Sequence, residues 1–181
     1  MAAYSDRSGE PLAAFRRGEI VRTALSGLFR THHFRKGESP ENPPASGSGP
    51  LFERHVPFLD LLEVRPVTAA AGHAEFELTV QNKHLRTLGI LHGGVAATLL
   101  DTAMGYAAGT RCPEGQTLVT AQLNINFTRP ALEGETLSVV GDVIHGGSRT
   151  AVTRGEVRRS DGGLVATGTA TFLYIPISAV K

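Results

Sequence analysis

The sequence is poor in cysteine, in charge and in long apolar runs. Cys112 is the only cysteine among 181 residues, which excludes a disulfide framework and a cysteine-rich zinc site. No eighteen consecutive residues are apolar, and no apolar core follows the first charges, so we expect neither a membrane span nor a secretory signal. Eighteen basic and 17 acidic side chains give a net charge of +1, which provides no electrostatic case for nucleic-acid binding. These absences together predict a cytoplasmic protein.

Two catalytic signatures are also missing from the chain. It contains neither a Gly-x-Ser-x-Gly nucleophile elbow nor a Gly-x4-Gly-Lys phosphate-binding loop. His32 and His33 have no pattern of carboxylates or thiols beside them. We therefore expect no metal site and no bound cofactor.

Glycine is abundant instead, at 21 residues, and the character of the chain changes near residue 50. Apolar residues within 11–34 could line one face of a helix, and the prolines, serines and glycines of 39–50 are typical of a linker. We predict an N-terminal extension over 1–50, a folded domain over 51–176 and a short tail over 177–181. The extension is interpreted as an accessory segment.

The folded domain is predicted to contain six strands and one helix. Residues 73–81 alternate apolar and polar side chains, as half-buried strands do, whereas 92–109 form an apolar helix rich in Ala, Leu and Gly. Further strands are predicted at 62–68, 119–127, 135–145, 149–159 and 164–175. Short connections with turn signals, such as 161–163, favour an antiparallel sheet. The fold class is therefore α+β, with the sheet wrapped around one central helix.

An isolated acid lies in the middle of the predicted helix. Asp101 is the only acidic residue between Glu77 and Glu114, and its helical neighbours are mostly apolar. Burying a carboxylate there is costly unless it is hydrogen bonded. Asp101 is therefore either a structural residue bonded to Thr98 or Thr102, or a catalytic group.

Two glycines, Gly93 and Gly94, begin the same helix after His92. The first N–H groups of a helix have no partner within the helix, and the helix dipole favours negative charge there. Glycine lets a ligand approach these groups, so the turn could polarise a carbonyl and hold the oxyanion formed when it is attacked. A tight turn from loop to helix would use the same residues.

The spacing of these two features restricts how they could act. Asp101 lies eight residues beyond Gly93, which is about 12 Å along a helix axis. A catalytic acid and an oxyanion donor must each come within about 3 Å of the reacting group. If both are catalytic, Gly93 of one subunit must meet Asp101 of another, which predicts a homodimer with two shared sites.

These residues resemble a known family. The segments 89–94 (GILHGG), 100–107 (LDTAMGYA) and 127–131 (FTRPA) are similar to those of the PaaI-like group of hotdog-fold acyl-CoA thioesterases. The resemblance extends over about residues 56–175. It implies a sheet around a long helix, and hydrolysis of an acyl-CoA thioester to a free acid and coenzyme A. It also implies dimers, often paired into tetramers, with active sites shared between subunits.

The resemblance assigns a role to each matching position. Asp101 would be the nucleophile or general base, and Gly93 would donate its N–H to the thioester oxygen. The Thr120 hydroxyl would orient water, and we expect it on the polar face of its strand. His92 would order the loop or contact the substrate, next to Gly94.

Arg86 departs from the family pattern, which often has Asn or Gln six residues before the histidine. A guanidinium donates hydrogen bonds but cannot accept them, so Arg86 would hold a phosphate or the substrate rather than orient water. Arg129, Arg149 and Arg154 could bind the phosphates of coenzyme A. Solvated charges at the sheet edge are the alternative for these three.

Two other functions stay open from the sequence. The protein could be a non-catalytic hotdog protein that binds acyl thioesters, or an interaction module that uses its N-terminal helix. A hydratase is a third possibility. It is disfavoured because no aspartate is followed five residues later by histidine, as in the hydratase branch of the hotdog proteins.

Overall fold

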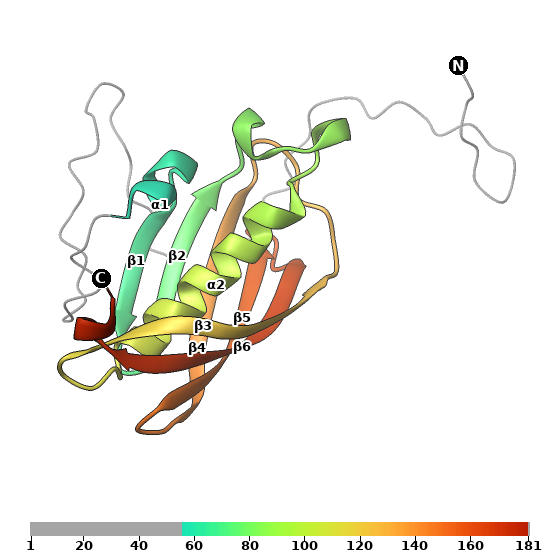
Figure 1. Cartoon of the computed structure of the whole chain (residues 1–181). Helices are drawn as coiled ribbons and strands as arrows, with labels where there is room; N and C mark the ends of the chain where they lie inside the picture. The colour runs from blue at the N-terminus through green and yellow to red at the C-terminus, as the bar shows by residue number, and fades with distance from the viewer. Residues whose placement is uncertain (1–55, 181) are drawn as a thin grey trace, which may run out of the picture. The chain divides into compact units, whose positions relative to one another are not determined.

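The structure is a computed structural model, and it describes residues 56–180 (Figure 1). The predicted N-terminal helix and linker lie outside these residues. The described helices and strands, in chain order, are α1 (Pro57–Leu62), β1 (Arg65–Ala70), β2 (His73–Thr79), α2 (Gly93–Gly109), β3 (Gln116–Phe127), β4 (Thr136–Gly146), β5 (Thr150–Arg159) and β6 (Leu164–Pro176). Short 3-10 turns, Asn82–His84, Thr87–Gly89 and Ile177–Ala179, complete the order.

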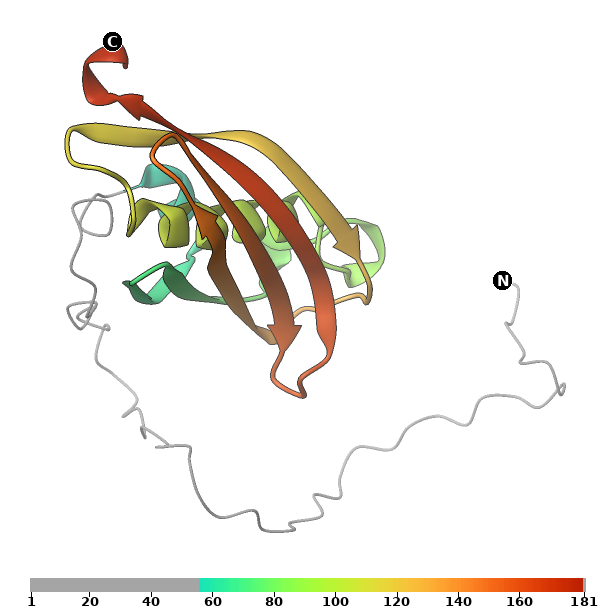
Figure 2. The same ribbon diagram turned by 90° about the horizontal axis from the view of Figure 1, so that it is seen from below.

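The six strands form one antiparallel sheet in the order β1-β2-β4-β5-β6-β3. This sheet curves around α2, which runs along its inner face (Figures 1 and 2). The predicted α+β class, with one long central helix wrapped by an antiparallel sheet, is confirmed.

Helix α2 buries one side against the sheet and leaves the other side half-buried. Its buried residues recur at helical spacing and are Ala96, Leu99, Leu100, Ala103, Met104, Ala107 and Ala108. The approach is close enough to need glycine on β4, because a Cβ on Gly141 would stand 2.4 Å from the backbone carbonyl of Ala103. The side of α2 that carries Asp101 is only half-buried, so it is accessible to a ligand.

The predicted strand over 62–68 is wrong at its start. Residues Pro57–Leu62 form α1, and β1 begins only at Arg65. Proline is well suited to the first turn of a helix, and Glu63 ends the helix in the left-handed conformation at φ 55°. Six residues are too few to show a helical period, which is why the pattern did not reveal α1.

Strand β3 contains a bulge that changes which side chains face the helix. Thr120 pairs with Phe172 of β6, but the next pair is Gln122 with Thr171, so Ala121 is an extra residue. Paired residues lie on the same face of a sheet, and Phe172 is buried on the inner face. Thr120 therefore faces the helix. The prediction that Thr120 lies on the polar face of its strand is wrong, because the bulge reverses the alternation partway along.

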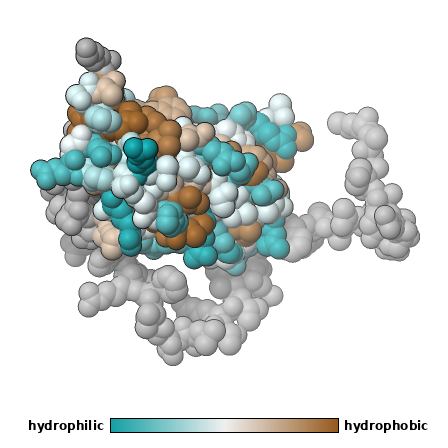
Figure 3. Space-filling model, turned by 60° about the horizontal axis from the view of Figure 1, so that its bottom comes forward, coloured by the Kyte–Doolittle hydropathy of each residue, from teal (hydrophilic) through white to brown (hydrophobic). Residues whose placement is uncertain are grey.

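Strand β3 also forms an open edge of the sheet. None of its residues is buried, and two of its apolar side chains, Val119 and Phe127, are 42% and 58% exposed. Figure 3 shows that apolar surface on the visible face is divided into patches by hydrophilic side chains. An unpaired edge strand such as β3 is suited to pairing with another chain.

Within residues 56–180, no helix combines the length and the apolar character that a membrane crossing requires.

Candidate active site

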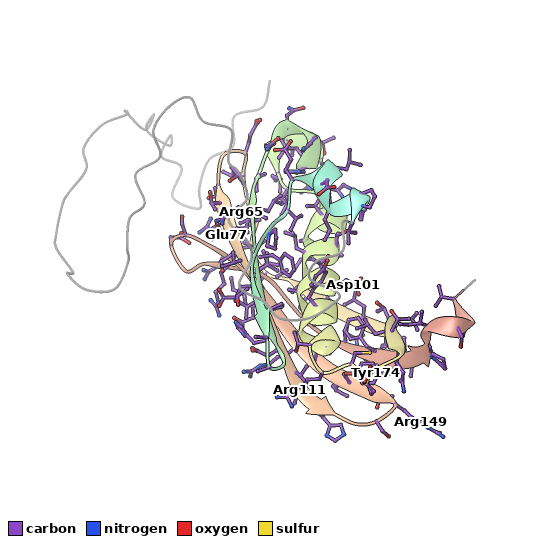
Figure 4. The ribbon with its side chains drawn as sticks, turned by 90° about the vertical axis from the view of Figure 1, so that its left-hand side faces the viewer. Arg65, Glu77, Asp101, Arg111, Arg149 and Tyr174 are labelled. Atoms are coloured by element: carbon purple, nitrogen blue, oxygen red, sulfur yellow. The ribbon has the colours of Figure 1, made fainter. Side chains whose placement is uncertain are left out.

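Asp101 faces a largely apolar cavity beside the half-buried side of α2 (Figure 4). Its Oδ1 accepts a hydrogen bond of 2.9 Å from the Thr120 hydroxyl, so the structure brings these two predicted residues together. Thr98, an expected alternative partner, instead donates to the carbonyl of Gly94. The bulge in β3 accounts for this contact, because it turns Thr120 toward the helix.

The Asp101 cavity has a volume of about 610 Å³ and lies between α1, α2, β3 and β6. Among the described residues, Asp101 is the only charged one that lines it. The apolar wall consists of Val56, Phe58, Leu59, Tyr106, Leu118, Val119 and Phe172, with Gly105 one turn after Asp101. The sequence pattern did not predict that residues 56–59 line this cavity, because it indicated no helix there. An apolar cavity beside a lone carboxylate is suited to an acyl group that presents a reactive carbonyl.

Gly93 lines a second cavity, of about 440 Å³, at the start of α2. This Gly93 cavity also contains Arg86, Phe127 and Arg129. A Cβ added to Gly93 would make ordinary van der Waals contact with the Phe127 ring, at 3.6 Å, so the Phe127 ring packs beside this residue. The two cavities share no lining residue, so Gly93 and Asp101 of one chain lie in different cavities.

The first turn of α2 leaves one N–H group available. The His92 ring accepts a hydrogen bond at Nδ1 from Gly94 N–H, at 2.9 Å, and thus caps the helix. The N–H groups of Val95 and Ala96 bond to the His92 carbonyl. Gly93 N–H has no partner within residues 56–180, so it is the donor that a substrate oxygen could use. The His92 ring therefore orders the turn at the start of α2, which is one of the two roles that the resemblance implied. The Gly94 N–H is occupied by its bond to this ring.

A short loop, 84–92, holds this turn in place. The Arg86 N–H donates to the Ile90 carbonyl at 2.8 Å, and the His92 N–H donates to the carbonyl of His84 at 2.8 Å. The His84 ring is fully buried, and burial lowers its pKa. Its Nδ1 accepts a bond from the Gln81 N–H, which fits a neutral ring. His84 is a supporting residue that the sequence patterns did not single out.

The four arginines considered from the sequence lie in different places. Arg86 and Arg129 share the Gly93 cavity. Arg154 is 69% exposed and lies 3.7 Å from Asp142 on the outer face of the sheet. Figure 4 shows Arg149 well away from Asp101. Arg154 thus lies on the solvated outer face of the sheet, as the alternative interpretation expected, whereas binding of coenzyme A phosphates by Arg129, Arg149 and Arg154 stays a prediction.

Comparison with known proteins supports this description of the chain. The Thioesterase superfamily matches residues 88–166. Human acyl-coenzyme A thioesterase 13 is 34% identical over 107 residues, which are 58% of this chain and 75% of the human protein.

Solved structures show the same likeness. The Escherichia coli PaaI protein, from the phenylacetic acid degradation operon, superposes with a TM-score of 0.64 at 27% identity, over 69% of this chain and 88% of PaaI. A Streptococcus mutans protein solved with bound acetyl CoA gives a TM-score of 0.58 at 29% identity, over 62% of this chain and 89% of that one. The chain therefore belongs to the hotdog-fold thioesterase superfamily, with PaaI and acyl-coenzyme A thioesterase 13 among its homologues.

Proposed function

We propose that this protein is an acyl-CoA thioesterase, which hydrolyses a thioester to a free carboxylic acid and coenzyme A. The observation that carries this proposal is the Thr120–Asp101 hydrogen bond at the mouth of an apolar cavity. Membership of the thioesterase superfamily supports the reaction class, and the relative solved with acetyl CoA supports the type of ligand. The cavity would take the acyl group.

Asp101 would carry the chemistry as nucleophile or general base. Its Oδ1 is held by Thr120, which leaves Oδ2 free either to attack the thioester carbon or to take a proton from water. The negative charge that develops on the thioester oxygen would be held by Gly93 N–H, helped by the positive end of the helix dipole. Neither role needs a metal or a redox cofactor.

The two groups would meet across a homodimer. Gly93 lies at the end of β3 that contains Phe127, and Asp101 lies at the end that contains Thr120. Pairing two β3 edges antiparallel about a two-fold axis reverses their ends. The Gly93 cavity of one subunit would then lie beside the Asp101 cavity of the other, and each dimer would hold two complete sites.

The first experiment measures thiol release from a panel of acyl-CoA substrates by the wild type and by Asp101→Asn. We expect turnover to fall by about 10²–10⁴-fold, the usual contribution of such a group. Asp142→Asn, on the outer face of the sheet, is the matched control and should keep wild-type turnover. Full activity in Asp101→Asn would contradict the proposal. Acyl-CoA binding without turnover by the wild type would favour the non-catalytic alternative.

A mixing experiment tests the shared site. Gly93→Val should block access to the N–H, so this variant and Asp101→Asn should each be inactive alone. Random exchange of their subunits gives one intact site in each mixed dimer, and about a quarter of wild-type activity should return. No recovery after exchange, or a monomer in sedimentation, would contradict the shared site.

Two further predictions concern the assembly of the protein and its location in the cell. The pairing of dimers into tetramers comes from the family resemblance, and sedimentation at several concentrations tests it. The cytoplasmic location comes from composition, and cell fractionation tests it.

A further inference from the structure

The two cavities carry opposite and unequal charges. Among the described residues, the Asp101 cavity is lined by one acid and no base, whereas the Gly93 cavity is lined by two arginines and no acid. Arg86 forms no ion pair and no side-chain hydrogen bond within residues 56–180, and Asp101 has only its bond from Thr120. A charge that lacks a partner is costly to remove from water. If the Gly93 cavity of one subunit closed on the Asp101 cavity of its partner, each of these charges would therefore require an opposite charge beside it.

Arg86 is fixed on the same wall as Gly93. The loop that carries it is closed by the bond from Arg86 N–H to the Ile90 carbonyl. Leu91 N–H then ties this loop to the Ala131 carbonyl, beyond the end of β3. Because Arg86 and Gly93 line the same cavity, an arrangement that brings Gly93 to a carbonyl beside Asp101 of the partner subunit would turn Arg86 toward that carboxylate as well.

We infer that Arg86 of one subunit forms an ion pair with Asp101 of the partner subunit and so positions the reactive carboxylate. This inference rests on the shared site of the proposed function. Thr120 would hold Oδ1 from within the subunit, and one guanidinium N–H would donate to one lone pair of Oδ2 from across the interface, which leaves the other lone pair of Oδ2 for attack or proton transfer. Arg86 is a positioning residue here, since it acts through Asp101.

Arg129 is the other arginine in the same cavity, but it lies after the end of β3 and not on the 84–92 loop that leads into Gly93. The Asp161 carboxyl has a pKa below its usual range, mainly through the Gly163 N–H, then through Arg159 and finally through the charge of Arg129. Tyr106 is the only other titratable side chain that lines the Asp101 cavity within the described residues. Arg86 is therefore the arginine that shares a loop with the Gly93 turn, and within residues 56–180 it has no ion pair.

A double-mutant cycle on dimer dissociation tests the pair without relying on turnover. Arg86→Gln should weaken the dimer at least tenfold in the wild-type background, because close charge pairs across interfaces show couplings above about 1.5 kcal/mol. In the Asp101→Asn background the same change should have little effect. Arg86→Lys keeps the charge and should restore part of the affinity. Arg129→Gln is the matched control and should show no coupling to Asp101→Asn.

The outcomes separate this inference from the proposed function. Equal effects of Arg86→Gln in both backgrounds would overturn the ion pair, even if Asp101→Asn abolished turnover. Retained turnover in Asp101→Asn would contradict the proposed function whatever the cycle showed. Circular dichroism of each variant identifies a folding defect, and the partial rescue by Arg86→Lys supports the pair independently of Arg86→Gln.

Discussion

The two cavities beside α2 differ in almost every property that matters for chemistry. The Asp101 cavity is apolar, contains a lone carboxylate and is walled by side chains from α1, β3 and β6. The Gly93 cavity presents a bare N–H group and two guanidinium groups. One can hold an acyl group and act on its carbonyl, and the other can hold negative charge. Neither alone can do both, so under the proposed function a single chain would contain two half-sites.

Glycine serves the two cavities for different reasons. At Gly93 the missing side chain exposes a hydrogen-bond donor at a helix start. At Gly105 it provides space, because a Cβ there would stand 3.4 Å from the Phe172 ring, on the wall of the Asp101 cavity. Under the proposed function, the first glycine would serve the charge that develops on the substrate, and the second would leave room for the acyl group.

After Asp101→Asn, the largest expected effect comes from removing the Thr120–Asp101 hydrogen bond in the Asp101 cavity. Thr120→Val has nearly the same shape but cannot donate to Asp101, and a hydrogen bond to a charged group contributes about 1.5–3 kcal/mol. We expect kcat to fall about tenfold or more. Steady-state thiol release measures the change.

The matched control for this variant is Thr169→Val. Thr169 lies exposed on β6, paired with Asn124 of β3, and lines neither cavity. It should keep wild-type kcat. Equal losses in the two variants would mean that Thr120 acts only through the stability of the sheet.

The next effect concerns the size of the acyl group. Gly105→Val adds three carbons at the wall formed with Phe172, so the cavity should accept shorter chains. We expect the ratio of kcat/KM for long over short acyl-CoA substrates to fall about tenfold, since each methylene in such a pocket is worth about 1–3 kcal/mol.

Gly105→Ala provides a graded comparison. Its Cβ makes ordinary contact with Phe172, and alanine favours a helix more than glycine does. The alanine variant should therefore be stable and show a smaller shift in the same ratio. An unchanged ratio in both variants would place the acyl group elsewhere.

The residues that α2 contributes to the two cavities could be predicted from the sequence. Asp101 is conspicuous because it is the one acid in an otherwise apolar helix. Gly93 is conspicuous because it begins that helix as part of a glycine pair. Their spacing, together with the regular helical rise, is enough to separate them into two places. Periodicity carries this information because α2 is 17 residues long.

The walls of the cavities could not be predicted in the same way. The bulge at Ala121 depends on the register between β3 and β6, which alternation within one strand does not contain. Helix α1 is too short to show a period. The sharing of one cavity by Arg86 and Arg129 depends on backbone bonds between the 86–91 loop and the end of β3. Contacts between distant segments of this kind require the structure.

The smallest effect lies outside both cavities and separates stability from activity. His73, on the outer face of the sheet, bridges two carboxylates, with Nδ1 2.8 Å from Asp142 and Nε2 3.0 Å from Glu75. Carboxylates only accept hydrogen bonds, so both ring nitrogens carry a proton in this arrangement. The bond to Asp142, with a smaller contribution from Glu75, raises the pKa of His73 above its ordinary value of 6.5.

A raised pKa stabilises the fold fully below the unfolded value, and this contribution is lost as the pH rises through the folded value. Urea unfolding should therefore show a larger deficit for His73→Gln at about pH 5.5 than at about pH 8.5. The effect should be modest, because the side chain is 39% exposed and solvent screens it. Thiol release should be unchanged, since His73 lines neither cavity. An equal deficit at both pH values would show that the ring stabilises the sheet by packing rather than by its charge.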